Sequence, residues 1–197
     1  MSTEIGQQEL AEIVLRAQNG SSEDFHLLYN LYSRPIFNFV RRLSGSANDA
    51  EDLTQDTFFK VHSELGKLRE PKQFKYWLFR IARNEVYQKL RRSQRTPEVS
   101  IDDEEVAYYD FLSDDSEDQD PESRILSLEM REVIDKTLGG LKPKYRDVFV
   151  LAAFHKMSYE DITKIVGRSL LSVKTDIYRA RLALKEALNK YLEKGKK

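Results

Sequence analysis

The stretch 158-SYEDITKIVGRSLLSVKTDIYRAR-181 decides the fold of the C-terminal part of this 197-residue chain. Ser158 can cap a short first helix, with Asp161 following three positions later. Gly167 suits a tight turn, and Ser169 can cap a second, longer helix. Apolar residues at helical spacing supply the inner faces, with Ile162, Ile165 and Val166 in the first helix and Leu170, Val173, Ile177, Ala180 and Leu184 in the second. This pattern predicts a helix-turn-helix.

The second helix of this motif carries basic and hydrogen-bonding side chains on its other faces. A helix with one buried face and one basic face fits the major groove of DNA, where its first residues meet base edges. Arg179, Arg181 and Lys185 would then meet phosphates. The alternative is a solvated basic helix in an ordinary bundle, which is common. Leu171 weakens that alternative slightly, because an exposed leucine away from the core stripe needs a reason.

A second basic segment, residues 67–95, holds ten basic residues against two acidic ones, with aromatic residues between them. Such a mixture suits unpaired nucleic acid, because bases stack on rings while phosphates meet cations. The competing interpretation assigns Trp77 and Phe79 to the core and leaves the cations merely solvated, and for Trp77 we prefer the core. The helix predicted over residues 72–92 has one polar and one apolar face, formed by Arg80, Arg83, Asn84, Tyr87 and Arg91 and by Leu78, Ile81, Ala82, Val86 and Leu90.

The preceding helix, predicted over residues 48–65, has a different surface. Its start is marked by Asn48 and Glu51 in the spacing of a capping box. Its core face is predicted to hold Ala50, Leu53, Thr57, Val61 and Leu65, and its opposite face to hold Asp52, Gln55, Asp56 and Phe59. An acidic face with an exposed aromatic ring suits a basic protein surface better than nucleic acid. A plain solvated face is the other interpretation.

The remaining pattern predicts an all-α protein of two small helical domains joined by an acidic flexible linker. Helices are predicted around residues 10–17, over 23–43 with Pro35 as a kink or break, over 123–138 and over 143–155. The predicted N-terminal domain is 1–92, the linker 93–122 and the C-terminal domain 123–197.

The charges of the chain are segregated, although its formal net charge is only −1. Residues 98–122 hold 12 acidic residues and no lysine or arginine, which favours an extended linker. The rest of the chain has 32 basic and 21 acidic residues, an excess of 11 positive charges. This asymmetry indicates a body that binds polyanions, interrupted by an acidic segment.

The composition also excludes several kinds of site. The chain has no cysteine, and His26, His62 and His155 are scattered without the spacing of a zinc site. Neither a Gly-rich phosphate loop nor a nucleophile elbow is present. We therefore expect no catalysis, metal, cofactor or small-molecule substrate. The N-terminus does not resemble a signal peptide and no apolar run could span a bilayer, so we expect a soluble cytoplasmic protein without membrane contact.

Several motifs together resemble the extracytoplasmic-function (ECF) sigma factors, which are small bacterial RNA polymerase specificity subunits. 49-DAEDLTQDTF-58 resembles their polymerase-binding motif, and 75-KYWLFRIARN-84 resembles the helix beside their −10 promoter-reading loop. 158-SYEDITKIVGRSLLSVKTDIYRARLALKEAL-188 resembles their −35-reading helix-turn-helix, preceded by a similar packing helix in 141-LKPKYRDVFVL-151. Thr163 and Ser172 depart from the family pattern, which usually has alanine and threonine there.

The resemblance implies three binding surfaces and three partners: core RNA polymerase through the clamp of its largest subunit, promoter DNA, and an anti-sigma factor. For polymerase it implies Asp49, Asp52, Leu53, Gln55, Asp56 and Phe59. For the −10 element, with an unstacked base captured beside the loop at 66–74, it implies Lys67, Lys72, Phe74, Lys75, Tyr76, Arg80, Arg83, Asn84, Tyr87, Arg91 and Arg92. For the −35 element it implies Arg168, Ser169, Leu171, Ser172, Lys174, Thr175, Tyr178, Arg179 and Arg181.

Two other functions compete with that of an initiation factor. A stand-alone helix-turn-helix regulator would bind duplex DNA tightly without polymerase, but it leaves the acidic helix and the cation-aromatic helix unexplained. A metal-dependent nuclease using the acidic cluster is disfavoured, because those carboxylates lie on no visible rigid scaffold.

Overall fold

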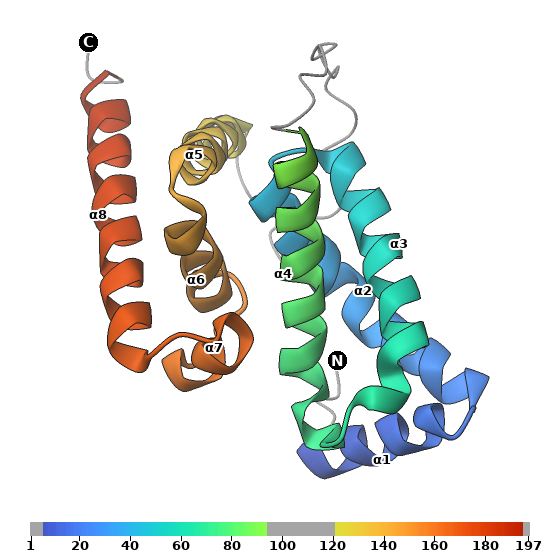
Figure 1. The fold of residues 1–197 in the computed structure, drawn as a ribbon. Helices are drawn as coiled ribbons and strands as arrows, with labels where there is room; N and C mark the ends of the chain where they lie inside the picture. The colour runs from blue at the N-terminus through green and yellow to red at the C-terminus, as the bar shows by residue number, and fades with distance from the viewer. Residues whose placement is uncertain (1–5, 94–120, 195–197) are drawn as a thin grey trace.

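The computed structural model describes residues 6–93 and 121–194, and these ranges contain eight α-helices, two short 3-10 helices and no strand. The predicted all-α fold is thereby confirmed. Helices gather into two groups, an N-terminal bundle of α1–α4 and a C-terminal bundle of α5–α8 (Figure 1). Within the described ranges, no helix is both long enough and apolar enough to cross a membrane. Most of the predicted linker, residues 94–120, lies outside them.

The N-terminal bundle closes around a core of aromatic and aliphatic side chains. Phe39, Phe74 and Phe79 are each at most 1% exposed, and the Phe39 and Phe79 rings meet edge to face with centroids 5.2 Å apart. Such close packing of rings stabilises a small core beyond the area it buries. The elements of this bundle are α1 Gln7–Gln18, α2 Ser22–Ser44, α3 Ala47–Glu64, the 3-10 helices Leu65–Lys67 and Pro71–Gln73, and α4 Phe74–Ser93.

Two local predictions in this bundle need correction. α3 begins at Ala47, and its cap is the Ser46 side chain, which accepts a hydrogen bond from the backbone N–H of Asp49 over 3.2 Å. Asn48 is thus already helical, so the predicted capping box does not form. The break predicted as one alternative at Pro35 is wrong, because α2 continues as one helix past that residue. The predicted core face of α3 is confirmed, since its five residues are all buried.

The C-terminal bundle contains the predicted helix-turn-helix. Ser158 caps α7 by accepting from the N–H of Asp161, and Gly167 ends it with φ of 68°, in the left-handed region that glycine adopts without strain. Ser169 accepts from the N–H of Ser172 over 3.3 Å and so caps α8. The elements of this bundle are α5 Pro121–Gly140, α6 Pro143–Ala153, α7 Tyr159–Val166 and α8 Leu170–Lys194. Pro143 at the first position of α6 is confirmed.

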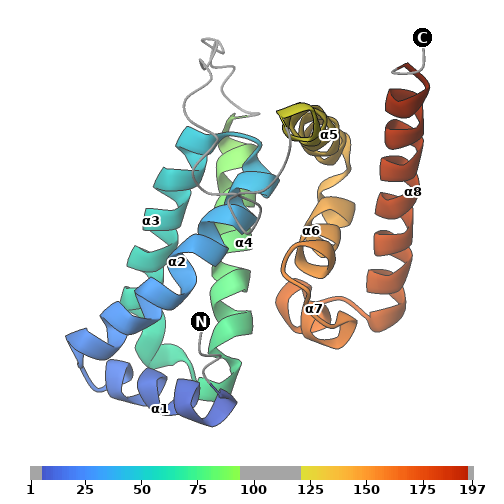
Figure 2. The ribbon, with the colours of Figure 1, turned by 180° about the vertical axis from the view of Figure 1, so that it is seen from behind.

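The two bundles lie side by side, with α2 and α4 turned toward α5, α6 and α7 (Figures 1 and 2). Arg146 joins them directly, because its guanidinium donates to the backbone oxygen of Leu43 over 2.7 Å. Arg42 adds a second link, with its guanidinium carbon 4.0 Å from the centre of the Phe154 ring. We call this arrangement closed, since polar surface of each bundle is covered by the other.

Candidate nucleic-acid and polymerase interfaces

The outward face of α3 matches the predicted polymerase-binding surface in part. Asp52, Gln55 and Asp56 are exposed, and Phe59 is 74% exposed, which is a large apolar area on an otherwise acidic face. Asp49 is half-buried and forms an ion pair with Lys89 of α4. Leu53 is only 3% exposed and packs in the core, so its inclusion among the contact residues needs correction. Leu53 packs α3 onto the bundle from the side opposite the acidic face.

The predicted −10 face of α4 is turned toward the C-terminal bundle. The Arg83 Nε donates to Asp147 Oδ2 over 2.6 Å, and the Tyr87 hydroxyl donates to the backbone oxygen of Pro143 over 3.0 Å. Arg80 donates to the backbone oxygen of Lys164. Three of the five residues predicted on this face are therefore occupied by contacts between the bundles. Burial raises the pKa of Tyr87, which keeps its hydroxyl protonated as a donor.

The first turn of α4 divides the other predicted −10 residues between core and surface. Phe74 is fully buried against Tyr32 and Trp77, so it cannot stack on a base and its inclusion needs correction. Tyr76 is half-buried beneath Lys164, whose Nζ lies 4.5 Å from the ring centre. Trp77 is half-buried and packs against the core, which agrees with the core position predicted for it. Lys75 is half-buried, whereas the exposed members of the set are Lys67, Lys72, Asn84, Arg91 and Arg92.

A single buried carboxylate links the two predicted DNA-binding regions. Asp147 has no exposed surface, and its oxygens accept from Arg83 of α4 over 2.6 Å and from Arg168, before α8, over 3.0 Å. Arg168 also donates to Asp176 over 2.6 Å. Burial raises the pKa of Asp147, and the two guanidinium groups oppose that rise by stabilising its charged form. No sequence motif indicated this contact, because its partners lie 64 and 21 residues away.

The predicted −35 surface lies mostly on the outside of the closed arrangement. Leu171 is 76% exposed and Tyr178 is 67% exposed. Arg179 donates to the Tyr145 hydroxyl over 2.8 Å, and this hydrogen bond lowers the pKa of Tyr145. Arg168 differs from the rest, because its donors are used within the bundle and not offered to a phosphate. Ser172 is half-buried, and the remaining exposed members are Ser169, Lys174, Thr175, Arg179 and Arg181.

His155, two residues after the end of α6, is a further part of the contact between the bundles that the sequence did not indicate. Its ring meets Phe79 and Phe39 edge to face, with centroids 5.1 and 5.7 Å apart. Burial lowers the pKa of His155 to about 4, and the nearby charges of Arg42 and Lys75 act in the same direction. The imidazole is therefore neutral at physiological pH.

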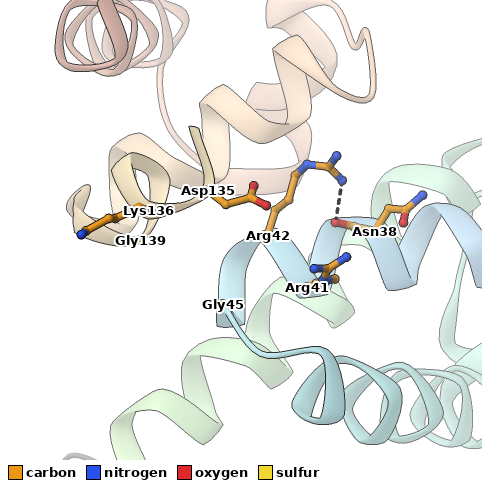
Figure 3. Close-up of a pocket in the computed structure, with 7 residues that line it drawn as sticks. All are labelled: Asn38, Arg41, Arg42, Gly45, Asp135, Lys136 and Gly139. Atoms are coloured by element: carbon orange, nitrogen blue, oxygen red, sulfur yellow. Dashed lines mark hydrogen bonds between the residues drawn. The ribbon is translucent and has the colours of Figure 1, made fainter. Parts of the chain in front are cut away.

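A cavity of about 310 Å³ lies where α2 meets α5 (Figure 3). Its lining includes three basic residues, Arg41, Arg42 and Lys136, and one acidic residue, Asp135. Arg42 donates to the backbone oxygen of Asn38 over 3.3 Å. The cavity marks the seam between the bundles and offers a positive potential. In residues 6–93 and 121–194, no cluster of three or more His, Asp or Glu side chains is arranged to hold a metal ion.

These features define a class of two-domain helical proteins that bind nucleic acid, with a helix-turn-helix at the C-terminal end. Residues 28–96 match the family model of Sigma-70 region 2, and residues 131–184 match the family model of Sigma-70, region 4. The chain is 32% identical to RNA polymerase sigma factor YlaC of Bacillus subtilis, over 84% of this chain and 92% of that protein. It is 30% identical to the ECF RNA polymerase sigma-E factor of Escherichia coli K12, over 93% of this chain and 95% of the relative.

Solved structures agree with these relatives. The structure of CnrH in complex with the cytosolic domain of CnrY has a TM-score of 0.67 and 25% identity, covering 92% of this chain and 97% of CnrH. The sigma factor RpoE of Bartonella quintana, in complex with the anti-sigma factor NepR, has a TM-score of 0.65 and 30% identity, covering 85% of this chain and 98% of RpoE. The chain belongs to the ECF group of the sigma-70 family.

Proposed function

We propose that this chain binds core RNA polymerase and directs it to promoters by reading a −10 and a −35 element. The observation that carries the proposal is the order of two sigma-70 regions along one chain, each coinciding with a helical bundle that bears a distinct binding surface. The protein lends specificity to polymerase and acts in the cytoplasm without catalysis of its own. Its functional division is 1–92 for polymerase and −10 binding, 93–122 as acidic linker, and 123–197 for −35 binding.

Polymerase is proposed to dock on the outward face of α3. Asp52, Gln55 and Asp56 share the exposed face of α3 with the ring of Phe59, so a basic surface with an apolar pocket is the complementary partner. The clamp of the largest polymerase subunit fills this role in the proposal. Asp49 contributes through its pairing with Lys89, which ties the start of α3 to α4.

The −10 element is proposed to bind α4 after the bundles separate. Arg80, Arg83 and Tyr87 are bonded to the C-terminal bundle in the closed arrangement, so opening releases two guanidinium groups and an aromatic ring for a separated DNA strand. Lys67 and Lys72 flank the connecting loop before α4 and are exposed for phosphate contact. The −35 duplex is proposed to meet the N-terminal half of α8 in the major groove.

An anti-sigma factor is the proposed regulatory partner. Two structurally similar proteins, CnrH and the RpoE of Bartonella quintana, were solved with CnrY and with the anti-sigma factor NepR. Both likenesses cover more than four-fifths of this chain, including both bundles. A stand-alone regulator is not favoured, because the relatives named above are polymerase sigma factors along nearly their whole length.

Run-off transcription with purified core polymerase over a promoter library tests the proposal. Wild-type chain is expected to start transcription from templates that share two spaced elements, and Asp52→Arg is expected to abolish binding to core. The charge reversal opposes a basic docking surface and leaves the fold intact, because Asp52 is exposed. Glu186→Arg, an equal reversal at an exposed site on α8, is the matched control. Unchanged core affinity of Asp52→Arg would contradict the docking assignment.

A further inference from the structure

The most exposed large apolar side chain in the described residues is Leu171, at 76%. It stands at the second position of α8, two residues after the cap residue Ser169, and its neighbour Leu170 is half-buried. The core stripe of α8 runs through Val173, Ile177 and other residues on the opposite side, so Leu171 supplies no packing there. A leucine at this exposure leaves most of its apolar surface in water.

The side chains around Leu171 form the outward face of the helix start. Lys174, Thr175 and Tyr178 follow at spacings of three, four and seven residues, and all three are exposed. The Thr175 hydroxyl donates to the backbone oxygen of Leu171 over 2.9 Å, and the Ser169 hydroxyl oxygen serves as the helix cap. Arg168 is bonded inward to Asp147 and Asp176. The first turn therefore presents an apolar tip beside three polar side chains, those of Arg168, Ser169 and Thr175, that already hold hydrogen bonds.

The major groove offers an apolar partner at one kind of base. Each base pair shows hydrogen-bond donors and acceptors there, and thymine alone adds a C5 methyl group. The first residues of a recognition helix are the ones that reach base edges. We propose that Leu171 selects thymine at one position of the −35 element by packing its isobutyl group on that methyl. The proposal rests on the proposed function, because it takes α8 as the −35 reader.

Replacing thymine by deoxyuridine tests this contact by removing only the methyl group. The full-length chain with core polymerase is first used to select promoters from a library. Each thymine of the selected −35 element, on either strand, is then replaced singly by deoxyuridine. Open-complex formation is measured for the wild type, for Leu171→Ala and for Leu192→Ala, a control that truncates a 50% exposed leucine far along the same helix.

We expect one position at which deoxyuridine weakens wild-type open-complex formation about fourfold. This factor corresponds to the burial of one methyl-sized group. Leu192→Ala should lose the same factor at the same position. Leu171→Ala should be insensitive to the replacement while still using the −10 element. Leu171→Met, which keeps an apolar tip, should retain part of the sensitivity.

Three outcomes overturn the proposal. The first is a selected −35 element without a shared thymine. The second is wild-type activity that no deoxyuridine replacement changes. The third is a Leu171→Ala chain that stays as sensitive to deoxyuridine as the wild type. A lower activity on every template would not rescue the proposal, because a leucine that contacts polymerase would give the same result. Failure of the proposed function is distinguishable, because it would leave no template of the library transcribed in the selection step.

Discussion

At the scale of single residues, Asp147 is the side chain on which the closed arrangement most depends. A carboxylate with no exposed surface is stable only when hydrogen bonds and opposite charges replace its water. Arg83 and Arg168 provide both, one from each side of the seam between the bundles. The same two arginines were predicted from sequence as DNA ligands, so Asp147 occupies donors that a phosphate would otherwise use.

Removing the Asp147 carboxylate is expected to destabilise the protein. Asp147→Ala leaves two guanidinium groups facing a site built for an anion, and breaking a buried ion pair in this way costs about 3 kcal/mol. Urea unfolding, followed by circular dichroism, measures this loss in free energy of unfolding. Asp56→Ala, which removes an exposed carboxylate, is the control and should change it little. A loss for Asp147→Ala no larger than for the control would show that the arginines rehydrate without cost.

His155 makes the stability of the protein depend on pH. Its pKa is about 4 when packed between Phe39 and Phe79, below the ordinary value of 6.5 in an unfolded chain. Between these values the unfolded state binds more protons than the folded state, so stability falls as pH drops from 6.5 toward 4.

The titration of His155 alone should lower the free energy of unfolding by up to about 2 kcal/mol at pH 5 relative to pH 7.5. The measurement compares unfolding free energies of wild type and His155→Phe at the two pH values, since phenylalanine keeps an aromatic ring but cannot titrate. The variant should show the smaller pH-dependent loss. Equal losses in both proteins would mean that other groups carry the effect.

At the scale of elements, the start of α3 separates the cap predicted from sequence, Asn48, from the cap found in the structure, Ser46. Ser46→Ala removes the hydroxyl that accepts from the N–H of Asp49, and loss of such a cap costs about 1 kcal/mol. Asn48→Ala should be close to neutral, because that side chain is exposed inside the first turn. Urea unfolding of both variants makes the comparison. A larger loss for Asn48→Ala would restore the capping box predicted from sequence.

Helix faces were predictable where apolar spacing was strong. The core stripe of α3 and that of α8 both follow the helical period, and all but the half-buried Leu170 of these ten positions are buried. Phe74 was misassigned because an aromatic residue among lysines has the same pattern whether it stacks on a base or fills a core. Leu53 was misassigned for a related reason, since a motif that resembles a binding site includes residues that only support it.

At the scale of the whole molecule, the closed arrangement leaves one of the two proposed DNA-binding surfaces exposed and covers much of the other. The −10 face of α4 is covered through Arg80, Arg83 and Tyr87, whereas Leu171 and Tyr178 of the −35 surface stay exposed. Under the proposed function, reading both elements therefore requires the bundles to move apart. Core polymerase and DNA can shift the balance toward the open state if they bind it more tightly than the closed one.

Fluorescence energy transfer between the bundles should report this opening. The chain has no cysteine, so Gln8→Cys and Asn189→Cys add two exposed labelling sites, one in each bundle. Transfer is expected to fall when the labelled chain binds core polymerase with a full promoter, because the bundles separate. A −35 duplex alone should leave it unchanged, since that surface is already exposed. Unchanged transfer in the promoter complex would contradict the need for opening.

The sequence by itself determined the helices, most of their caps and the nature of each surface, because these depend on spacing and side-chain chemistry within a few residues. It also determined the family, since motifs keep their order along the chain. Only the tertiary structure decided which polar residues face outward. Arg83 and Leu171 both look like surface residues in the sequence, yet one meets a buried carboxylate 64 positions away and the other meets water. That difference arises from how two bundles pack, and local patterns carry no record of it.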